Sequence, residues 1–160
     1  MSVAFTKEAD TENAAATDLP DRPISPHPNL VTESGLAELD AALEQARADY
    51  AANQAGDGRE GDMRALARAA RDLRYFAARR ATAQVQPAPA DRSAVRFGHR
   101  VTIERADGRR QTLRLVGEDE ADPRRGTVSY VSPFAAALLG KSEGDTATIA
   151  GDEVEIVEIR

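Results

Sequence analysis

The sequence contains no cysteine and no tryptophan. Without cysteine, a disulfide framework and any metal site built on thiolates are excluded. Aromatic residues make up 4% of the 160 residues and alanine supplies much of the apolar content, so one large core for the whole chain is not expected. No apolar run approaches the ~20 residues that a membrane-spanning helix needs. The N-terminus also lacks the basic and then apolar order of a secretory signal. We therefore expect a cytoplasmic protein without membrane contact.

Motifs for common enzyme chemistry are missing as well. We find no P-loop, no dinucleotide-binding fingerprint and no nucleophile elbow. His27 lies in a proline-rich segment and His99 in a turn before a predicted strand, and neither has a second ligand or nucleophile at a useful spacing. We therefore predict that the protein is not an enzyme and has no cofactor of its own.

Charge is segregated along the chain, although the net charge is only −6. Residues 1–29 carry a net −3 and residues 30–63 a net −6, whereas residues 64–94 carry +5 and residues 95–160 carry −2. An acidic segment followed by a basic one favours an antiparallel pair of helices.

Residues 1–29 are rich in threonine, alanine and acids, and they end in four closely spaced prolines, Pro20, Pro23, Pro26 and Pro28. Prolines at this density favour an extended path over a helix. We predict a disordered leader. It is either a solvated tail or a strip that lies along the surface of a partner.

Two apolar stripes with helical spacing follow the leader. The first consists of Leu36, Leu39, Leu43, Ala46 and Tyr50, and the second of Met63, Leu66, Ala70, Leu73 and Ala77. Spacings of three and four residues are typical of helices that pack along one face. Thr32 and Asp62 are the candidate N-caps of the two helices.

The segment between the stripes, QAGDGREGD, is too rich in glycine to continue either helix. Two helices with matching seams and a short polar connection predict an antiparallel helical hairpin, or coiled coil, over residues 30–86. Pro87 and Pro89 mark a linker, residues 87–94, that leads to a second domain.

Residues 95–160 have the pattern of strands. One alternating strand leads into Asp107-Gly108, the commonest two-residue hairpin turn, and a second strand returns from it. The final strand carries its apolar residues at Val154, Ile156, Val157 and Ile159. Together these signals predict an antiparallel sheet with one short helix packed on it, and the whole chain falls in the α+β class.

Ser132 and Pro133 are the expected start of that short helix. Serine is a favoured N-cap, and proline at the first helical position loses no hydrogen bond. Gly140 is expected to end the helix in the left-handed conformation that glycine adopts without strain.

The stretch from Leu115 to Asp145, LVGEDEADPRRGTVSYVSPFAAALLGKSEGD, resembles the C-terminal domain of the bacterial GreA/GreB transcript cleavage factors. Their pattern is a strand ending in I/L-V-G-x-x-E-x-D, a turn, an I-S strand and S-P-x-A-x-A-L-L-G-K-x-x-G-D. The matching positions are Val116, Gly117, Glu120, Asp122, Gly126, Ser129, Ser132, Pro133, Ala135, Ala137, Leu138, Leu139, Gly140, Lys141, Gly144 and Asp145. The resemblance implies an FKBP-like C-terminal domain in a regulator of transcription elongation that binds RNA polymerase.

The N-terminal half is similar to the same family at two places. LVTESGLAELDAAL resembles the opening of the Gre coiled coil, and residues 73–75 resemble the returning arm of a GreB-type hairpin. In that family the coiled coil enters the secondary channel of RNA polymerase, where an acidic tip, G-D-x-x-E-N, helps to hold a second catalytic Mg²⁺ beside backtracked RNA. Residues 56–61, GDGREG, keep this core with Gly61 in place of the asparagine. The resemblance implies that Asp57 and Glu60 act on the polymerase-bound Mg²⁺, with transcript RNA and DNA as indirect partners.

The hairpin is shorter than the GreB pattern. Because the first arm lacks about nine residues and the second about five, the tip loses on the order of 10 Å of reach at 1.5 Å per helical residue. Asp57 and Glu60 therefore either stimulate the cleavage of RNA by polymerase or form an ordinary solvated turn. In the second case the protein competes with Gre factors in the channel. It would then be similar to the Rnk-type regulators, which pair a short hairpin with the same C-terminal domain.

The resemblance also implies a docking loop for polymerase at Ser132 and Pro133. Val131 stands where a GreB-type factor has aspartate. An FKBP-like fold raises prolyl isomerase activity as a remote alternative. That activity needs an aromatic-lined pocket, which fold likeness alone does not supply. We predict a monomeric regulator instead.

Arginines are concentrated in the second predicted helix, at Arg64, Arg68, Arg71, Arg74, Arg79 and Arg80. Such a basic face can follow a phosphate backbone or an acidic channel wall. It can equally pair with acids of the first helix, mainly Glu38, Asp40 and Glu44. The sequence leaves both interpretations open.

Overall fold

The computed structural model describes residues 19–160, apart from the side chain of Glu60. Most of the predicted leader, residues 1–18, therefore lies outside the described residues. Contacts divide the chain into two units. The first contains Leu39–Thr82 with the segment that ends at Ser25, and the second contains Pro26–Glu38 and Ala83–Arg160. None of the helices in the described part combines the length and apolar character that a membrane span requires.

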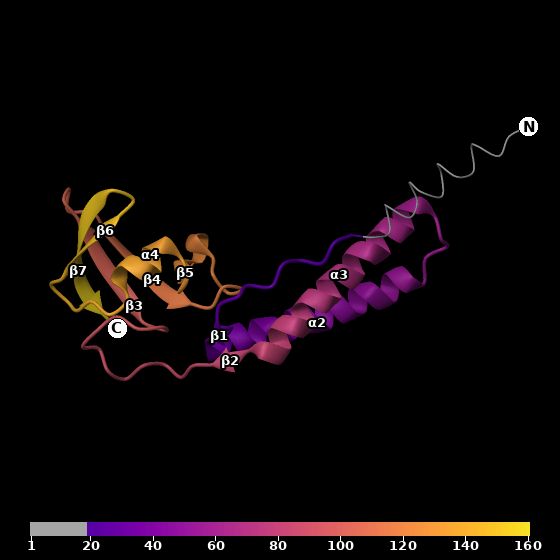
Figure 1. Cartoon of the computed structure of the whole chain (residues 1–160), viewed down its shortest axis with the longest axis horizontal. Helices are drawn as coiled ribbons and strands as arrows, with labels where there is room; N and C mark the ends of the chain where they lie inside the picture. Colours follow the sequence, from indigo (N-terminus) through magenta and orange to yellow (C-terminus); the bar gives the residue numbers. More distant parts are fainter. Residues whose placement is uncertain (1–18) are drawn as a thin grey trace, which may run out of the picture. The chain divides into compact units, whose positions relative to one another are not determined.

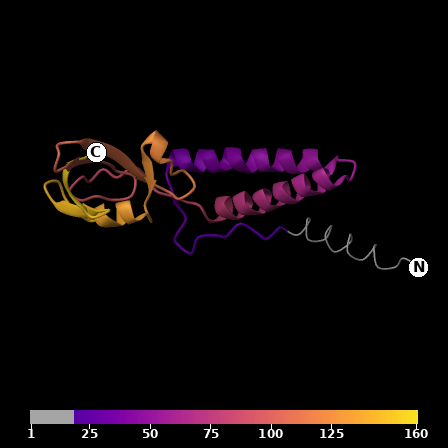
Figure 2. The same ribbon diagram turned by 90° about the horizontal axis from the view of Figure 1, so that it is seen from above.

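Two long helices form the predicted hairpin. They are α2 (Glu33–Gln54) and α3 (Glu60–Thr82), and they lie side by side in Figure 1 and Figure 2. The stripe on α2 is confirmed, because Leu39, Leu43 and Ala46 are buried. On α3 the buried apolar residue is Ala69, whereas the predicted Ala70 is only half-buried. The α3 seam is therefore displaced by one residue from the pattern that the sequence predicted.

The helix starts agree with the sequence at one end of the hairpin only. Thr32 is the N-cap of α2 as predicted, because its Oγ1 accepts a hydrogen bond from Gly35 N at 3.0 Å. Helix α3 begins at Glu60, where Met63 N already donates to Arg59 O at 3.0 Å. Asp62 is therefore in the first turn of α3 and is not its cap.

The described part of the second unit contains a five-stranded sheet in the order β5-β4-β3-β7-β6. The strands are β3 (Arg100–Arg105), β4 (Arg110–Val116), β5 (Thr127–Ser129), β6 (Thr146–Ile149) and β7 (Asp152–Ile159). Three of the pairings between these strands are antiparallel, but β5 pairs with β4 in parallel. The predicted antiparallel sheet is thus a mixed sheet. The reason is that β5 follows a 3₁₀ turn, η1 (Pro123–Arg125), which returns the chain to run in the same direction as β4.

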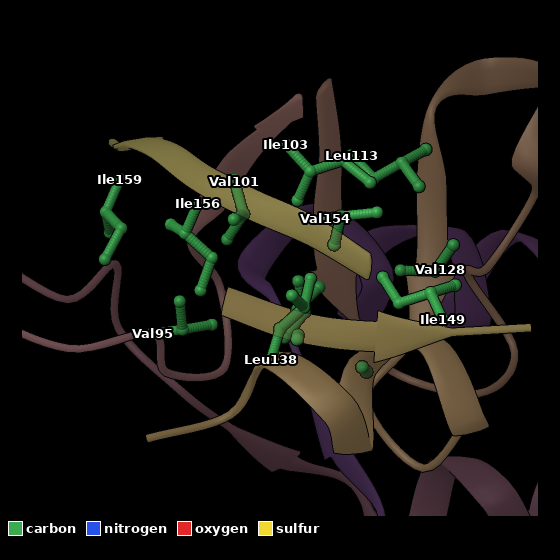
Figure 3. Packing of buried hydrophobic residues seen from close by; sticks show 13 residues of the cluster. Val95, Val101, Ile103, Leu113, Val128, Leu138, Ile149, Val154, Ile156 and Ile159 are labelled. Atoms are coloured by element: carbon green, nitrogen blue, oxygen red, sulfur yellow. The ribbon is translucent and has the colours of Figure 1, made fainter. Parts of the chain in front are cut away.

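The core of this unit lies between the sheet and α4 (Pro133–Leu138), whose Leu138 is among the inward-facing side chains in Figure 3. On β7, Val154, Ile156 and Ile159 are buried as predicted, but Val157 is not. The register with β3 shifts between Thr102 and Ile103. This irregularity lets both Ile156 and Ile159 face the core, although they are an odd number of residues apart.

The turn between β3 and β4 differs from the prediction. Arg105 N donates to Arg109 O at 2.9 Å, which closes a loop of three residues instead of two. Gly108 takes a positive φ of 80° in that loop, and Asp107 Oδ1 accepts from Arg109 N at 3.0 Å. This is the three-residue hairpin in which a left-handed residue forms a bulge, so Asp107-Gly108 is not a two-residue turn.

A second, smaller sheet lies at the start of the hairpin. Strand β1 (Leu30–Val31) pairs in parallel with β2 (Gln84–Val85), so the segment before α2 lies beside the segment after α3. Residues of both segments belong to the unit that contains the large sheet. The two units therefore differ from the predicted ranges 30–86 and 95–160.

Candidate functional site

The loop before α4 is held in one conformation by its own hydrogen bonds. Ser132 Oγ accepts from Ala135 N at 3.2 Å, and Ser132 N donates to Ser129 O at 3.0 Å. Pro133 follows as the first residue of α4 and is exposed. The predicted cap is confirmed, and the loop presents the proline ring at the surface. The structure does not test the docking role of these two residues, which stays a prediction.

The aromatic residues of this unit have packing roles. The rings of Phe97 and Tyr130 meet edge to face with their centroids 5.6 Å apart, and the Tyr130 hydroxyl donates to Pro28 O. Phe134 packs against the core beside α4. Tyr130 thereby ties the loop before α4 to the segment that precedes α2.

Glu120, in the loop between β4 and η1, binds the first residues of the helical hairpin. Its Oε1 accepts hydrogen bonds from Thr32 N at 2.8 Å and from Gly117 N at 3.0 Å, and its Oε2 accepts from Thr32 Oγ1. Thr32 is 2% exposed, so these donors are out of reach of water. Glu120 itself is half-buried, and a carboxylate that accepts several hydrogen bonds is a strong local constraint. We call these interactions the Glu120 clamp.

Two glycines make room for the clamp. A Cβ atom on Gly35 would lie 2.3 Å from Glu120 Cδ, and one on Gly117 would lie 2.3 Å from Leu30 O. Both distances are far below van der Waals contact, so any side chain at either position would force the clamp apart. Gly117 and Glu120 were matched in the sequence only as parts of a pattern. Their physical role is to hold the start of α2, together with Gly35 of the hairpin.

The tip of the hairpin places its two acids in different settings. Asp57 is in the loop between the helices, exposed, and its Oδ2 lies 3.0 Å from Arg59 Nε. Glu60 is the first residue of α3 rather than a loop residue. Mg²⁺ prefers free carboxylate oxygens together with water, whereas Asp57 is bound by a guanidinium. Among the described side chains, which do not include that of Glu60, no three acidic or histidine groups gather as a metal site. The role of Asp57 and Glu60 toward a polymerase-bound Mg²⁺ therefore stays a prediction.

The arginines of α3 are not equivalent. Arg64, Arg68 and Arg74 are exposed and Arg71 is half-buried, but Arg79 is only 2% exposed and does not belong to the basic surface. We call the group of Arg64, Arg68, Arg71, Arg74 and the adjoining Tyr75 the arginine face. Their spacing places them along one side of α3.

The acids predicted to neutralise these arginines have other partners. Asp40 pairs with Arg80 across the hairpin. Glu38 instead binds Arg125 at 3.1 Å, and Glu44 pairs with Arg47 on its own helix. Of the three acids predicted to pair with the arginines of α3, Asp40 does so, and Glu38 and Glu44 have partners elsewhere.

Part of the predicted leader lies on α3 instead. Asp21 Oδ1 accepts from Arg74 Nε at 2.6 Å, and Arg22 Nη1 donates to Asp72 Oδ1 at 3.2 Å. The guanidinium of Arg22 also stacks over the ring of Tyr75, 3.7 Å from its centroid. The sequence showed the extended path of this segment but not its partner. The Asp-Arg pair between Pro20 and Pro23 was the available signal.

His99 is buried at the start of β3. Its Nδ1 accepts a hydrogen bond from Arg96 N at 3.0 Å. Burial disfavours the charged imidazolium and lowers the pKa of His99 from its ordinary value of 6.5. Burial therefore favours the neutral form of His99 at the start of β3.

Residues 89–160 match the family model described as "Transcription elongation factor, GreA/GreB, C-term". The chain is 54% identical over 59 residues to the transcription elongation factor GreA of Hyphomonas neptunium. The aligned stretch covers 36% of this chain and 38% of that protein. It is 48% identical over 69 residues to GreA of Alkalilimnicola ehrlichii, covering 40% and 44%. The predicted resemblance to the GreA/GreB family is thus confirmed for the C-terminal part.

The chain spans about two fifths of the length of these curated relatives. A solved structure, GreA factor homolog 1 (Gfh1) of Thermus thermophilus, aligns with 84% of this chain and 99% of that chain at 20% identity and a TM-score of 0.40. The loop at Ser132 and Pro133 lies within residues 89–160, the part of the chain that matches the family model.

Proposed function

We propose that this protein regulates transcription elongation by binding RNA polymerase at its secondary channel. The observation that carries this proposal is the match of residues 89–160 to the C-terminal domain of GreA/GreB factors. In the proposal, the loop at Ser132 and Pro133 docks on the polymerase. Its fixed cap and exposed proline ring suit a rigid contact, because little order has to be gained on binding.

The Glu120 clamp has a part in this function. It joins the matched domain to Thr32 and so to the first turn of α2. A docked C-terminal domain therefore also holds the start of the helix that leads to the tip. The protein needs no active site of its own in this proposal, because any hydrolysis of RNA takes place in the polymerase.

The tip favours occupancy of the channel without cleavage over the stimulation of cleavage. Asp57 is paired with Arg59, Gly61 replaces the family's asparagine, and Glu60 is in the helix. The helices have 22 and 23 residues, which at 1.5 Å per residue gives each a length of roughly 33–35 Å. A factor of this kind competes with Gre factors. Rescue of backtracked complexes is the alternative, in which Asp57 and Glu60 reach the polymerase-bound Mg²⁺.

Transcript cleavage in a purified, backtracked elongation complex separates these functions. The proteins to compare are the wild type, the double variant Asp57→Asn/Glu60→Gln, and a control, Asp49→Asn, which neutralises an exposed acid on α2. We expect no stimulation by any of the three, with binding to polymerase intact. Cleavage that the wild type and the control stimulate and the double variant does not would instead establish a cleavage factor.

A further inference from the structure

Strand β6 forms one edge of the five-stranded sheet. It pairs with β7 on one side, and no strand among the described residues pairs with it on the other. These two strands form the yellow hairpin in Figure 1. The side chains of β6 alternate, because Ala147 and Ile149 are buried in the core with α4, whereas Thr146 and Thr148 are exposed. The edge of β6 is therefore at the surface of this unit.

The backbone groups of Thr146 and Thr148 point away from the sheet. Ile156 N, on β7, donates to Asp145 O at 2.9 Å. The residues of an antiparallel strand that bond to its neighbour alternate along the chain. The bonds from β6 to β7 thus fall next on the two buried residues, and the N–H and C=O groups of both threonines face outward. Within the described part of the chain, neither threonine backbone has a partner on that side.

The sequence of β6 does not protect this edge. Edge strands of natural proteins commonly carry lysine, proline or a bulge, which keeps further strands from pairing. Residues 146–149, TATI, contain neither lysine nor proline, and their register with β7 is regular. Threonine and isoleucine also favour the extended conformation. Because β6 has four residues, the edge suits a short additional strand rather than a long one.

The strand next to this edge is acidic. Glu155 and Glu153 lie opposite the two exposed threonines, and both are exposed. Neither has an ion-pair partner among the described residues. On its other side Glu155 lies opposite Glu104, which is paired with Arg110. Like charges directly opposite each other destabilise a sheet, so a cation that approached Glu155 from the side of β6 would be favourable.

Geometry and charge together define the partner. An added strand would lie about 5 Å beyond β6 and about 10 Å from β7. Its lysine or arginine side chains could extend over the threonines toward Glu153 and Glu155. A nucleic acid would be repelled by these acids, and a second copy paired through the same edge would bring threonines instead of cations. Residues 1–18 contain one lysine and four acids, so they do not supply the basic segment either.

We propose that the β6 edge binds a short, basic, extended segment of another protein, which adds a sixth strand to the sheet. The outward backbone groups of the two threonines supply hydrogen bonds, and Glu153 and Glu155 supply the preference for lysine and arginine. This inference goes beyond the proposed function and does not depend on it.

Amide hydrogen exchange followed by NMR tests the geometry in the full-length protein. Without a partner, the amides of Thr146 and Thr148 should exchange quickly, whereas those of Ala147 and Ile149 should be protected by their bonds to β7. An eight-residue peptide in which lysine alternates with valine should then slow exchange at both threonines by roughly tenfold or more at saturation. The same peptide with glutamate in place of lysine should leave their exchange unchanged.

Binding of a fluorescent form of the lysine peptide at low salt tests the residues. Thr148→Pro removes an outward N–H but no bond to β7, so the protein should stay folded and bind roughly tenfold more weakly. Thr146→Lys, which places a cation on the edge, should also weaken binding and provides a second variant if the proline disturbs the fold.

The acids are tested with a pair of charge-matched variants. Glu153→Gln/Glu155→Gln should weaken binding of the lysine peptide roughly threefold to tenfold. The control Glu44→Gln/Asp49→Asn removes two exposed acids from α2 instead, and it should change binding by less than about twofold.

Three results would contradict the proposal. If the lysine peptide leaves exchange at both threonines unchanged, or binds the folded edge variants as tightly as the wild type, it does not add to β6. If the glutamate peptide binds equally well, the assigned charge of the partner is wrong. If both amides are protected without peptide in a protein that sediments as a dimer, the occupant is a second copy. None of these assays contains polymerase, so failure here is distinct from failure of the proposed function.

Discussion

Replacing Glu120 should destabilise the protein more than any other change of an acid in the second unit. Glu120→Ala removes the acceptor for two backbone N–H groups and one hydroxyl, and it leaves Thr32 N buried without a partner. A hydrogen bond to a charged acceptor contributes about 1.5–3 kcal/mol, and an orphaned buried donor costs about 1–3 kcal/mol. Because the three bonds share one side chain, they do not add, and we expect a loss of about 2–4 kcal/mol in the free energy of unfolding.

Glu120→Gln should be milder for a geometric reason. Both backbone N–H groups, of Thr32 and Gly117, bond to the same oxygen, Oε1. A glutamine can keep its oxygen there, so only the bond from Thr32 Oγ1 and the charge are lost. Thr32 Oγ1 has Ser34 Oγ at 2.9 Å as another partner. We expect a loss of about 1 kcal/mol.

Urea denaturation followed by circular dichroism measures both losses. A suitable control is Glu153→Ala, an exposed acid on β7, which should change the free energy of unfolding by less than about 0.5 kcal/mol. The order of stability should be wild type, glutamine variant, alanine variant. The reasoning is refuted if Glu120→Ala loses no more than the control, or if the glutamine and alanine variants are equally unstable.

Three further changes test separate features of the structure. Gly35→Ala should destabilise the wild type by about 2 kcal/mol, because the new Cβ would meet Glu120. In the Glu120→Ala variant the same change should stabilise the protein by up to about 1 kcal/mol, because alanine favours a helix. A double-mutant cycle in urea shows whether the sign of the effect reverses. Ala150→Gly should stabilise the protein by about 1 kcal/mol, because Ala150 has a φ of 51° in the β6–β7 turn, where glycine is unstrained. In a thermal melt this variant should raise Tm, whereas the control Ala136→Gly, within helix α4, should lower it. Folding lowers the pKa of His99 from its unfolded value of 6.5, so the stability that the neutral side chain supplies is present above pH 6.5 and is lost as the pH falls. His99→Asn should abolish this dependence of the free energy of unfolding on pH between about pH 7.5 and 5. An unchanged slope of that free energy against pH would contradict the role given to His99.

Much of the second unit could be predicted because its signals are local. Ser132 with Pro133 fixes the start of α4, and alternation of apolar residues places Val154 and Ile156 in the core. The parallel pairing of β5 was not predictable in the same way. It depends on the path of the chain through η1, which periodicity does not encode.

The contacts of residues 19–25 with α3 and the Glu120 clamp were missed because both join residues far apart in the chain. Asp21 and Arg74 are 53 residues apart, and Glu120 and Thr32 are 88 apart. Glu120 could be found only as a position in a pattern. The reason that glutamate is needed there, three donors around one carboxylate, appears once the chain is folded.

The start of α3 shows a different limit. Asp62 is a good N-cap by residue type, but Glu60 already begins the helix. Propensity ranks candidate caps without fixing which of two neighbouring positions is used. The consequence reaches the functional interpretation, since Glu60 leaves the loop that Asp57 occupies.

Competition with GreA for RNA polymerase tests the central proposal most directly. Core polymerase would be saturated with fluorescently labelled GreA, and this protein or its Pro133→Glu variant added in increasing amounts. The account predicts that the wild type displaces GreA and that Pro133→Glu, while still folded by circular dichroism, does so at least tenfold less well. Failure of the folded wild type to displace GreA at any concentration, or equal displacement by both proteins, would contradict it.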